Sequence, residues 1–389
     1  MFKKILIANR GEIALRIIRS LKEMGIKTVS LFSDVDKNSL HTYFADESYY
    51  IGQPEPTLSY LNIKKIIEVA KKSGSDAIHP GYGFLAENPS FAEACEKEGL
   101  IFIGPSSRAM RLLGDKLEAR RIARENKIPV VEGSLKGFKE IKKAREYASK
   151  IGYPVLLKAS AGGGGKGMRL VKDQSEMKIL FNESKRESFS AFGDSTIYIE
   201  KYLKKPRHIE FQVLGDRYGK TIHLGERECS IQRRYQKVIE ESPSIIIDSN
   251  LRERMGDAAI KLAKASEYTN AGTIEFMVDE ERNFYFLEVN ARLQVEHPVT
   301  ELTRGVDLVR EQILVSSGER IDKKLENAEL RGWAIECRIN AEDPENNFYP
   351  SFGKIEHLRI PQGPGVRVDC GITEGSEVSV YYDSLIANL

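Results

Sequence analysis

The first hundred residues alternate between short apolar runs and amphipathic segments, and this pattern restricts the fold more than any other feature. The runs at 3–9, 27–33, 76–81 and 101–104 are typical of strands, and the segments at 11–25, 59–74 and 91–99 are typical of helices. The first helical segment ends at Gly25 and places one set of apolar side chains on one face: Ile13, Ile17, Ile18, Leu21 and Met24. Strands and helices that alternate across short turns predict a parallel, doubly wound sheet.

A ligand is expected at the edge of this sheet where the strands end. The segment HPGYGFLAEN, residues 79–88, follows one strand, and Gly81 and Gly83 bend the chain around Tyr82. A plain strand-to-helix turn explains this segment equally well. Asp34 stands where a ribose-binding acid could lie, but ANRGEI has one glycine where the dinucleotide fingerprint needs three. A nicotinamide site is therefore excluded.

Five glycines lie among residues 162–167, within the stretch LLKASAGGGGKGMRLV. A Walker A loop is excluded, because Gly167 follows Lys166 where that motif needs Ser or Thr. The flanking runs at 153–160 and 166–171 have the composition of strands, so they predict a hairpin with a glycine tip. An ordinary surface turn rarely needs so many glycines. A flap whose N–H groups close over an anion is the favoured interpretation.

Polar and apolar residues alternate along FLEVNARLQVEHPV, residues 286–299. Counting by twos puts five polar residues on one face of a strand: Glu288, Asn290, Arg292, Gln294 and Glu296. The preceding run, 272–278, is expected to pair with this strand and to place Glu275 close to opposite Glu288. Like charges that face each other destabilise a ladder unless something neutralises them, and two carboxylates with an amide oxygen suit Mg²⁺. The alternative is an ordinary solvent-exposed face.

The composition is that of a globular enzyme with more than one domain. The 389 residues include 59 Lys and Arg against 57 Asp and Glu, a net charge of +2, so no nucleic-acid partner is expected. The four cysteines are far apart and form no C-x-x-C pair, which favours a reducing, cytoplasmic location. The N-terminal apolar run is too short for a signal sequence, and no membrane partner is expected.

The flap with its lysines, the carboxylate hairpin and the N-terminal sheet together indicate ATP bound between two domains. Their order resembles the ATP-grasp superfamily, and the detailed motifs resemble its biotin carboxylase family. The motifs that carry this resemblance are IANRGEIALRI, IHPGYGFLAEN, FIGPSS, LGDK, KASAGGGGKGMR, EKYL, PRHIEFQVLGD, ECSIQRRYQK, EVNARLQVEHPVTE and ECRINAEDP. Ten motifs in order, spread from Lys3 to the end of the chain, make the resemblance specific.

The resemblance implies an ATP-grasp fold of the α/β and α+β classes. It implies an N-terminal Rossmann-like domain with a doubly wound parallel sheet at 1–113 and a helical connection at 114–129. A small lid domain with the glycine flap is expected at 130–203. A larger antiparallel-sheet domain is expected at 204–389.

Members of this family use ATP to phosphorylate bicarbonate, and the resulting carboxyphosphate supplies CO₂ to N1′ of carrier-bound biotin. The resemblance implies an ATP site made by Lys116, Lys158, Gly164 and Gly165 at the phosphates, by Glu200, Lys201, Tyr202 and Leu203 at the adenine, and by His208 and Tyr235 near the nucleotide. The implied ligands of Mg²⁺ or Mn²⁺, which also belong to this ATP site, are Glu275, Glu288 and Asn290.

The implied bicarbonate pocket holds an anion and a base. Lys237, Arg292 and the backbone at Gln294 and Val295 are implied to bind the anion, and Glu296 is the implied general base. Arg338 is implied to stabilise the negative ureido oxygen of biotin, and Tyr82 is placed in the same pocket. The alternative for Arg338 is a structural ion pair with a nearby glutamate.

One position departs from the family pattern, which has histidine where this chain has Tyr235. A phenol donates a hydrogen bond but carries no positive charge, so nucleotide affinity is expected to differ. Two rival functions stay open at this point. One is another bicarbonate-phosphorylating ATP-grasp enzyme, such as a carbamoyl-phosphate or carboxyaminoimidazole synthetase, and the other is a non-catalytic scaffold protein. HPGYGFL and ECRINAEDP together argue against the first, and the intact polar set argues against the second.

The implied partners are a biotin carboxyl carrier protein, a carboxyltransferase component and a second copy of the chain. Arg19, Glu23 and Arg367 match positions implied at the dimer contact of the family, whereas Pro364 departs from the pattern there. The final acceptor, such as acetyl-CoA, propionyl-CoA or pyruvate, is not determined by the sequence. The chain stops at SLIANL, residues 384–389, which is expected to begin a buried strand with unpaired backbone, because family members continue with a further strand and helices.

Overall fold

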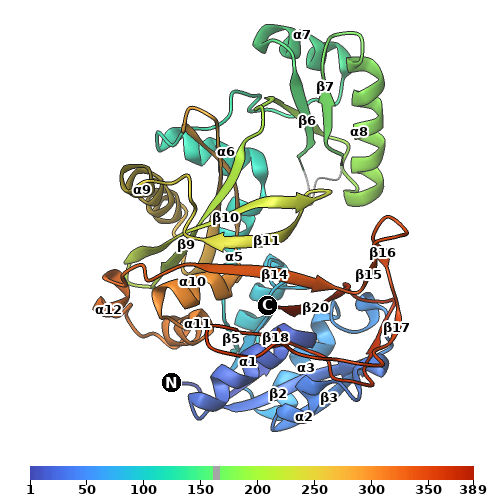
Figure 1. The fold of residues 1–389 in the computed structure, drawn as a ribbon, viewed down its shortest axis with the longest axis vertical. Coiled ribbons are helices and arrows are strands. Elements are labelled where there is room, and N and C mark those ends of the chain that lie inside the picture. The colour runs from blue at the N-terminus through green and yellow to red at the C-terminus, as the bar shows by residue number, and fades with distance from the viewer. Residues whose placement is uncertain (161–166) are drawn as a thin grey trace.

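The N-terminal residues form the predicted parallel sheet. The structure is a computed structural model that describes residues 1–160 and 167–389. The strands pair in the order β3-β2-β1-β4-β5, and their bounds are β1 Lys4–Ile7, β2 Lys27–Ser33, β3 Glu47–Gly52, β4 Ala77–His79 and β5 Ile101–Phe102. The helices of this unit (Figure 1) are α1 Gly11–Glu23, α2 Leu40–Phe44, α3 Ile63–Ser73 and α4 Pro89–Lys97, with 3₁₀ turns at Asp34–Asp36 and Pro56–Leu58.

Local sequence explains where these elements begin and end. The apolar face of α1 is buried against Ile5 and Ile7, as the periodicity predicts. The side chain of Asn62 accepts a hydrogen bond at the start of α3, and that of Asn88 does so at the start of α4, where Pro89 is the first helical residue. Gly74 ends α3 in the left-handed conformation.

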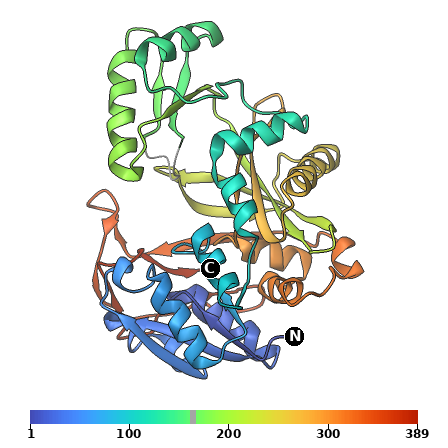
Figure 2. The same cartoon turned by 180° about the vertical axis from the view of Figure 1, so that it is seen from behind.

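Two helices connect this unit to a lid that stands at one end of the molecule (Figures 1 and 2). The connecting helices are α5 Ser107–Gly114 and α6 Lys116–Glu125, and the lid contains α7 Ile141–Ile151, β6 Val155–Ala159, β7 Arg169–Val171, α8 Met177–Phe192 and β8 Ile197–Lys201. The strands β6 and β7 pair antiparallel, which confirms the hairpin predicted on both sides of the glycine run. The tip itself, with Gly164 and Gly165, lies outside the described residues.

An eight-stranded sheet with the order β13-β12-β9-β10-β11-β14-β20-β18 forms the large C-terminal part. Its strands are β9 Arg207–Gly215, β10 Thr221–Arg233, β11 Gln236–Ser242, β12 Asn270–Val278, β13 Phe284–Asn290, β14 Ala334–Asn340, β18 Asp369–Cys370 and β20 Leu385–Asn388. The helices are α9 Ser249–Ala265, α10 His297–Arg304, α11 Leu308–Ser316 and α12 Lys323–Glu326. Two small two-stranded sheets complete it, β15 Glu342–Asp343 with β16 Tyr349–Pro350 and β17 Gly353–Lys354 with β19 Glu377–Val378.

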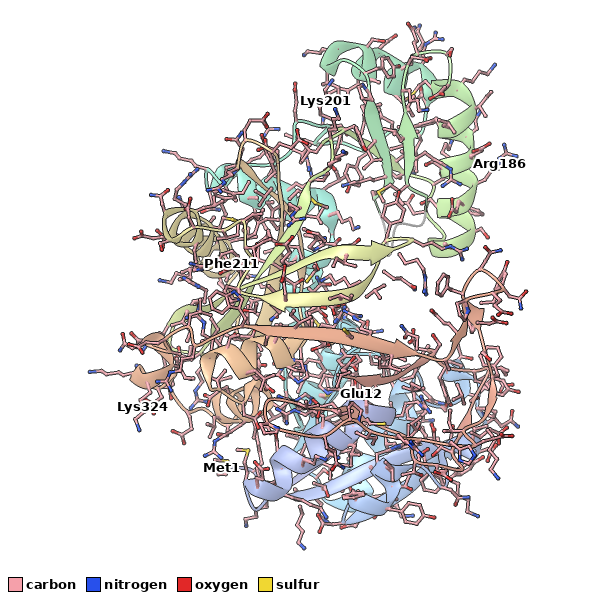
Figure 3. The ribbon with its side chains drawn as sticks, in the orientation of Figure 1. Met1, Glu12, Arg186, Lys201, Phe211 and Lys324 are labelled. Atoms are coloured by element: carbon pink, nitrogen blue, oxygen red, sulfur yellow. The ribbon has the colours of Figure 1, made fainter. Side chains whose placement is uncertain are left out.

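Both faces of the large sheet are packed. Phe211 and Phe276 lie in a core that the sheet shares with α5, α6 and α9, and Figure 3 shows Phe211 within the sheet region. Leu214 and Ala271 belong to a second core that the sheet shares with α11 and with α1 of the N-terminal unit. The predicted combination of a parallel and an antiparallel sheet is confirmed. The domain boundaries stay a prediction.

The C-terminal strand corrects one expectation. Strand β20 pairs with β14 on one side and with β18 on the other, so its backbone is not unpaired as the sequence suggested. All four cysteines lie among the described residues and are free thiols. Within the described part of the chain, no helix combines the length and apolar character needed to cross a membrane. The cytoplasmic location stays a prediction.

Candidate active site

A cavity of about 1330 Å³ is lined by residues of the N-terminal unit, the lid and the large sheet. The N-terminal unit contributes the turn after β4, where a Cβ at Gly81 would lie 2.9 Å from the amide nitrogen of Asn9. That amide donates to the carbonyls of Pro80 and Tyr82, so the glycine lets the turn close against β1. Tyr82 lines the cavity, as predicted.

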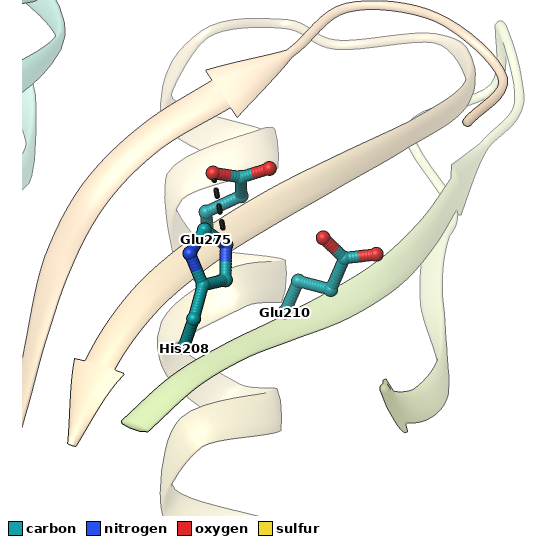
Figure 4. A group of neighbouring side chains, drawn as sticks. All are labelled: His208, Glu210 and Glu275. Carbon is teal, nitrogen blue, oxygen red and sulfur yellow. Dashed lines mark ion pairs between the residues drawn. The ribbon is translucent and has the colours of Figure 1, made fainter. Parts of the chain in front are cut away.

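The carboxylate pair lies at the edge of the large sheet. Glu275 on β12 is the direct partner of Glu288 on β13, as the hairpin prediction required. On its other side Glu275 is paired with Glu210 on β9, so three glutamates form a row across three strands. Figure 4 shows Glu275 turned toward His208, with Glu210 on the neighbouring strand.

Cationic side chains balance this row. The ammonium of Lys237 is 2.9 Å from Glu275 Oε1, and it also contacts Glu210. His208 Nε2 lies 3.1 Å from Glu275 Oε2, and Lys116 Nζ lies 3.0 Å from Glu288 Oε2. Burial opposes ionisation of Glu275, but Lys237 and His208 outweigh it and lower the pKa of this carboxyl. Glu275 is therefore ionised at neutral pH.

The donor set fits a hard divalent cation. Glu275, Glu288 and Asn290 offer oxygen atoms and line the same cavity. His208, Glu210 and Glu275 also bring three potential ligand atoms within 4.8 Å of one another. The hard oxygens of the first set suit Mg²⁺ better than a set that includes an imidazole.

Glu296 is fully enclosed, with a side chain that is 0% exposed, as Glu210 and Glu240 are. It stands immediately before α10, where Lys237 Nζ lies 2.6 Å from Oε1 and Arg338 Nη2 lies 2.8 Å from Oε2. Burial raises the pKa of Glu296, but Lys237, Arg338 and Arg227 lower it by more, so the net pKa is well below the usual range. The prediction that nearby cations keep Glu296 ionised agrees with this geometry.

The chain between β13 and α10 corrects the predicted strand. Regular pairing ends at Asn290, so Arg292 and Gln294 lie on an irregular segment and not on one continuous face. Both still line the cavity, together with Val295, which the alternation had placed on the other face. Among the described residues the buried amide nitrogen of Gln294 has no hydrogen-bond partner, and an unpaired buried donor suits a small anion.

Arg338 makes the ion pairs that were the alternative to a role at biotin. Its guanidinium lies 2.6 Å from Glu240 Oε1 as well as 2.8 Å from Glu296 Oε2. It nevertheless lines the cavity. Arg338 therefore makes these ion pairs and is still placed at the wall of the cavity.

The lid contributes the residues predicted at the nucleotide. Lys158 pairs with Glu200, whose buried carboxylate also pairs with Arg120. The ammonium of Lys201 donates to the carbonyl of Gly152 at 2.8 Å, so this side chain is tied to the lid itself. Tyr202 and Leu203 line the cavity with them.

Tyr235 lies at the tip of the β10–β11 hairpin. Arg234 and Tyr235 form a two-residue turn with φ values of 51° and 66°, a conformation that favours Asn and Gly over large side chains. Tyr235 lines the cavity but is 60% exposed. Its side chain is thus far more exposed than those of Lys116 and Lys158, which are 22% and 14% exposed.

Three family models match consecutive parts of the chain. "Biotin carboxylase, N-terminal domain" matches residues 1–110, "Carbamoyl-phosphate synthase L chain, ATP binding domain" matches 115–324, and "Biotin carboxylase C-terminal domain" matches 336–389. The chain belongs to the biotin carboxylase family. The two flanking models favour a biotin carboxylase over a carbamoyl-phosphate synthetase, because only the central model carries the carbamoyl-phosphate synthase description.

Relatives of this family match the whole chain. Biotin carboxylase 1 of Bacillus subtilis is 53% identical over 390 residues, which cover 100% of this chain and 87% of that protein. The biotin carboxylase of a Nostoc species is 53% identical over 388 residues, which cover 100% of this chain and 87% of that protein.

Solved biotin carboxylase structures share the fold. The biotin carboxylase domain dimer of Hydrogenobacter thermophilus 2-oxoglutarate carboxylase, in complex with MgADP, ADP and bicarbonate, has a TM-score of 0.97 and 49% identity. The match covers 100% of this chain and 85% of that one. The chain is an ATP-dependent carboxylating ligase of this family, which performs the first half-reaction of a biotin-dependent carboxylase.

Sequence reasoning missed several side chains that hold this biotin carboxylase site together. Glu87 binds Arg292 at 2.8 Å and also accepts from the backbone of Ala291. Glu210 and Arg227 form a fully buried pair at 2.5 Å beneath Lys237. Glu87 lies in the GFLAEN motif, so the motif was a usable signal. The alternation in HIEFQVLG could have suggested Glu210.

Proposed function

We propose that this chain carboxylates N1′ of carrier-bound biotin within the cavity described above, with Glu296, Lys237 and Arg338 as the reacting groups. The observation that supports this most strongly is the contact of one buried carboxylate with two cations, near an amide nitrogen of Gln294 that has no partner among the described residues. Such a pocket binds a small anion and removes a proton from it. Bicarbonate has both properties.

Different side chains have different roles in the proposed reaction. Lys116 and Lys158 bind and orient the ATP phosphates, while Lys237 and Arg292 hold bicarbonate next to Glu296. Glu296 accepts the bicarbonate proton when the anion draws Lys237 and Arg338 away from it. Arg338 then faces the ureido oxygen of biotin, where negative charge develops. Glu275, Glu288 and Asn290 would hold Mg²⁺, which would neutralise charge at the phosphates.

One assay tests this function against the two rivals. ATP hydrolysis is measured with bicarbonate, in the presence and absence of free biotin. Stimulation by biotin is expected. Stimulation by ammonia in place of biotin would support a carbamoyl-phosphate type of activity, and the absence of hydrolysis would support a scaffold role.

A separate biotin carrier and a carboxyltransferase component are the proposed partners. Carrier domains of this kind present a biotinylated lysine between two methionines in a hairpin, whereas SEMKILF, the nearest pattern here, runs into helix α8. Streptavidin is therefore expected to detect no covalent biotin on this polypeptide, and detection would contradict a separate carrier.

The chain is also proposed to form a homodimer through the face that carries Arg19, Glu23 and Arg367. Arg367 is bound to Glu301 at 2.6 Å, and Arg19 lies 3.7 Å from Asp369, so the face is ordered by its own ion pairs. The Hydrogenobacter relative is described as a dimer. Light scattering of Arg19→Glu against wild type tests this contact, and an unchanged mass would exclude it.

A further inference from the structure

Two buried glutamates face each other beside Arg338. Glu240 on β11 and Glu336 on β14 are direct partners in the antiparallel ladder, and their side chains are 0% and 2% exposed. Among the residues described, neither oxygen of Glu336 has a hydrogen-bond partner, and Glu240 Oε2 has none either. Ionised carboxylates only accept hydrogen bonds, so a proton on the pair supplies the missing donor.

The two glutamates differ in the cations near them. Arg338 Nε lies 2.7 Å and Nη2 2.6 Å from Glu240 Oε1, whereas no ion pair of Glu336 is found in the described part of the chain. Beyond Glu336 lies Glu12 on α1, a further buried acid, which accepts from the amide of Asn388. The negative charge is therefore best placed on Glu240, and the proton on Glu336.

The titration behaviour is consistent with this division. Burial and the charge of Glu240 raise the pKa of Glu336 well above its usual value. Burial raises the pKa of Glu240 to about 7, although Arg338 opposes the shift. The titratable or charged groups on the elements packed here include Lys237 and Glu241 on β11, Arg227 and Cys229 on β10, Cys337 on β14, Glu296 and His297 at α10, and Glu12 and Arg16 on α1.

We propose that Glu240 is a second, titrating counter-ion for Arg338, and that a neutral Glu336 keeps the pair at a single negative charge. When Glu240 is ionised, the guanidinium is shared between Glu240 and Glu296, and Glu296 keeps more of its basicity. When Glu240 is protonated, Arg338 interacts with Glu296 alone and makes it a weaker base. Glu240 is thus a positioning residue for the proposed function, on which this inference rests.

The test compares pH profiles of bicarbonate-dependent ATP hydrolysis. Glu240→Gln imitates the protonated state at every pH. The wild-type kcat is expected to rise about 10-fold between pH 6 and 8 as one group ionises, and the variant is expected to lose this rise while its KM for ATP is unchanged. A Glu240→Gln profile that rises like the wild type would overturn the proposal.

Two further variants separate this role from a structural one. Glu336→Gln replaces a neutral carboxyl by a neutral amide, so the rise is expected to persist, and an infrared band of a buried protonated carboxyl should be lost. If the rise in kcat occurs at lower pH in Glu336→Gln than in the wild type, Glu336 is ionised in the wild type, and this would contradict the proposal. Glu241→Gln, next on the same strand, is the matched control and should keep the wild-type profile.

The activity of Glu296→Gln distinguishes a failure of the role proposed for Glu240 from a failure of the proposed function. If that variant is inactive while Glu240→Gln keeps the wild-type profile, only the role of Glu240 is wrong. If Glu296→Gln hydrolyses ATP normally, the proposed function of Glu296 fails first, whatever Glu240 does.

Discussion

Glu275 and Glu288 lie directly opposite each other in the β12–β13 ladder, and different cations balance them. Lys237 and His208 contact Glu275, whereas Lys116 contacts Glu288. Without these neighbours the two like charges would destabilise the hairpin. The ladder therefore places a carboxylate pair, and the cations that balance it, at the wall of one cavity.

Glu288→Gln is expected to weaken metal binding, because it removes one of the two anionic ligands. The Mg²⁺ concentration that gives half-maximal ATP hydrolysis should rise by about 10-fold or more. Direct titration with Mn²⁺, followed by electron paramagnetic resonance, should show the same loss. Glu281→Gln, in the exposed turn of the same hairpin, is the matched control. An unchanged metal requirement in Glu288→Gln would remove this carboxylate from the site.

Glu296→Gln should bind ATP nearly as well as the wild type and yet hydrolyse it at least about 10²-fold more slowly with bicarbonate, because the general base is lost. Since Lys237 and Arg338 hold the pKa of Glu296 well below its usual range, its ionisation should not limit the wild-type rate above about pH 5. Single-turnover hydrolysis and nucleotide binding by calorimetry measure the two effects separately. Near-normal turnover would exclude Glu296 as the base.

Tyr235→His restores the residue usual in the family and should lower the KM for ATP. The gain should be greater at pH 6 than at pH 8, because an exposed imidazole is charged only below about pH 6.5. Tyr235→Phe removes the hydroxyl without adding charge and is the control. Equal KM values for the wild type and Tyr235→His at pH 6 would show that position 235 does not contact the nucleotide.

His41 is expected to make the fold sensitive to acid. Its ring is 0% exposed, its Nε2 lies 3.1 Å from the carbonyl of Leu31, and burial lowers its pKa to about 4. Between this value and the unfolded value of about 6.5, only the unfolded chain binds the proton, so stability falls as pH decreases through that window. The loss from pH 7 to pH 5 should be about 2 kcal/mol.

Urea unfolding of wild type and His41→Gln at pH 7, 6 and 5 measures this contribution. The variant should lose less stability over that range. Buried acids with raised pKa values act in the opposite direction, as Glu12 does with a pKa of about 8, so the difference between the two proteins is the informative quantity. Parallel curves for the two proteins would contradict the assignment to His41.

The sequence by itself determined the features that depend on local periodicity and motifs. Alternating strands and helices predicted the parallel sheet. The prediction of the apolar face of α1 was correct because side chains return to the same face of a helix about every 3.6 residues. The short turn after β12 predicted that Glu275 lies close to Glu288, and a register shift beside Leu287 makes the two direct partners. The ordered motifs identified the family, which the family models confirm.

Only the tertiary structure decided where the strand alternation stops and which charges meet. A bulge beside Leu287 changes which side chains of β13 are buried, and Phe286 faces the core although it shares the parity of Glu288. Arg338 reaches Glu296 from 42 positions away. The pKa of Glu240 depends on burial and on Arg338, which lies on a neighbouring strand. A buried charge is set by all of its neighbours in space, and a linear pattern contains only those next to it in the chain.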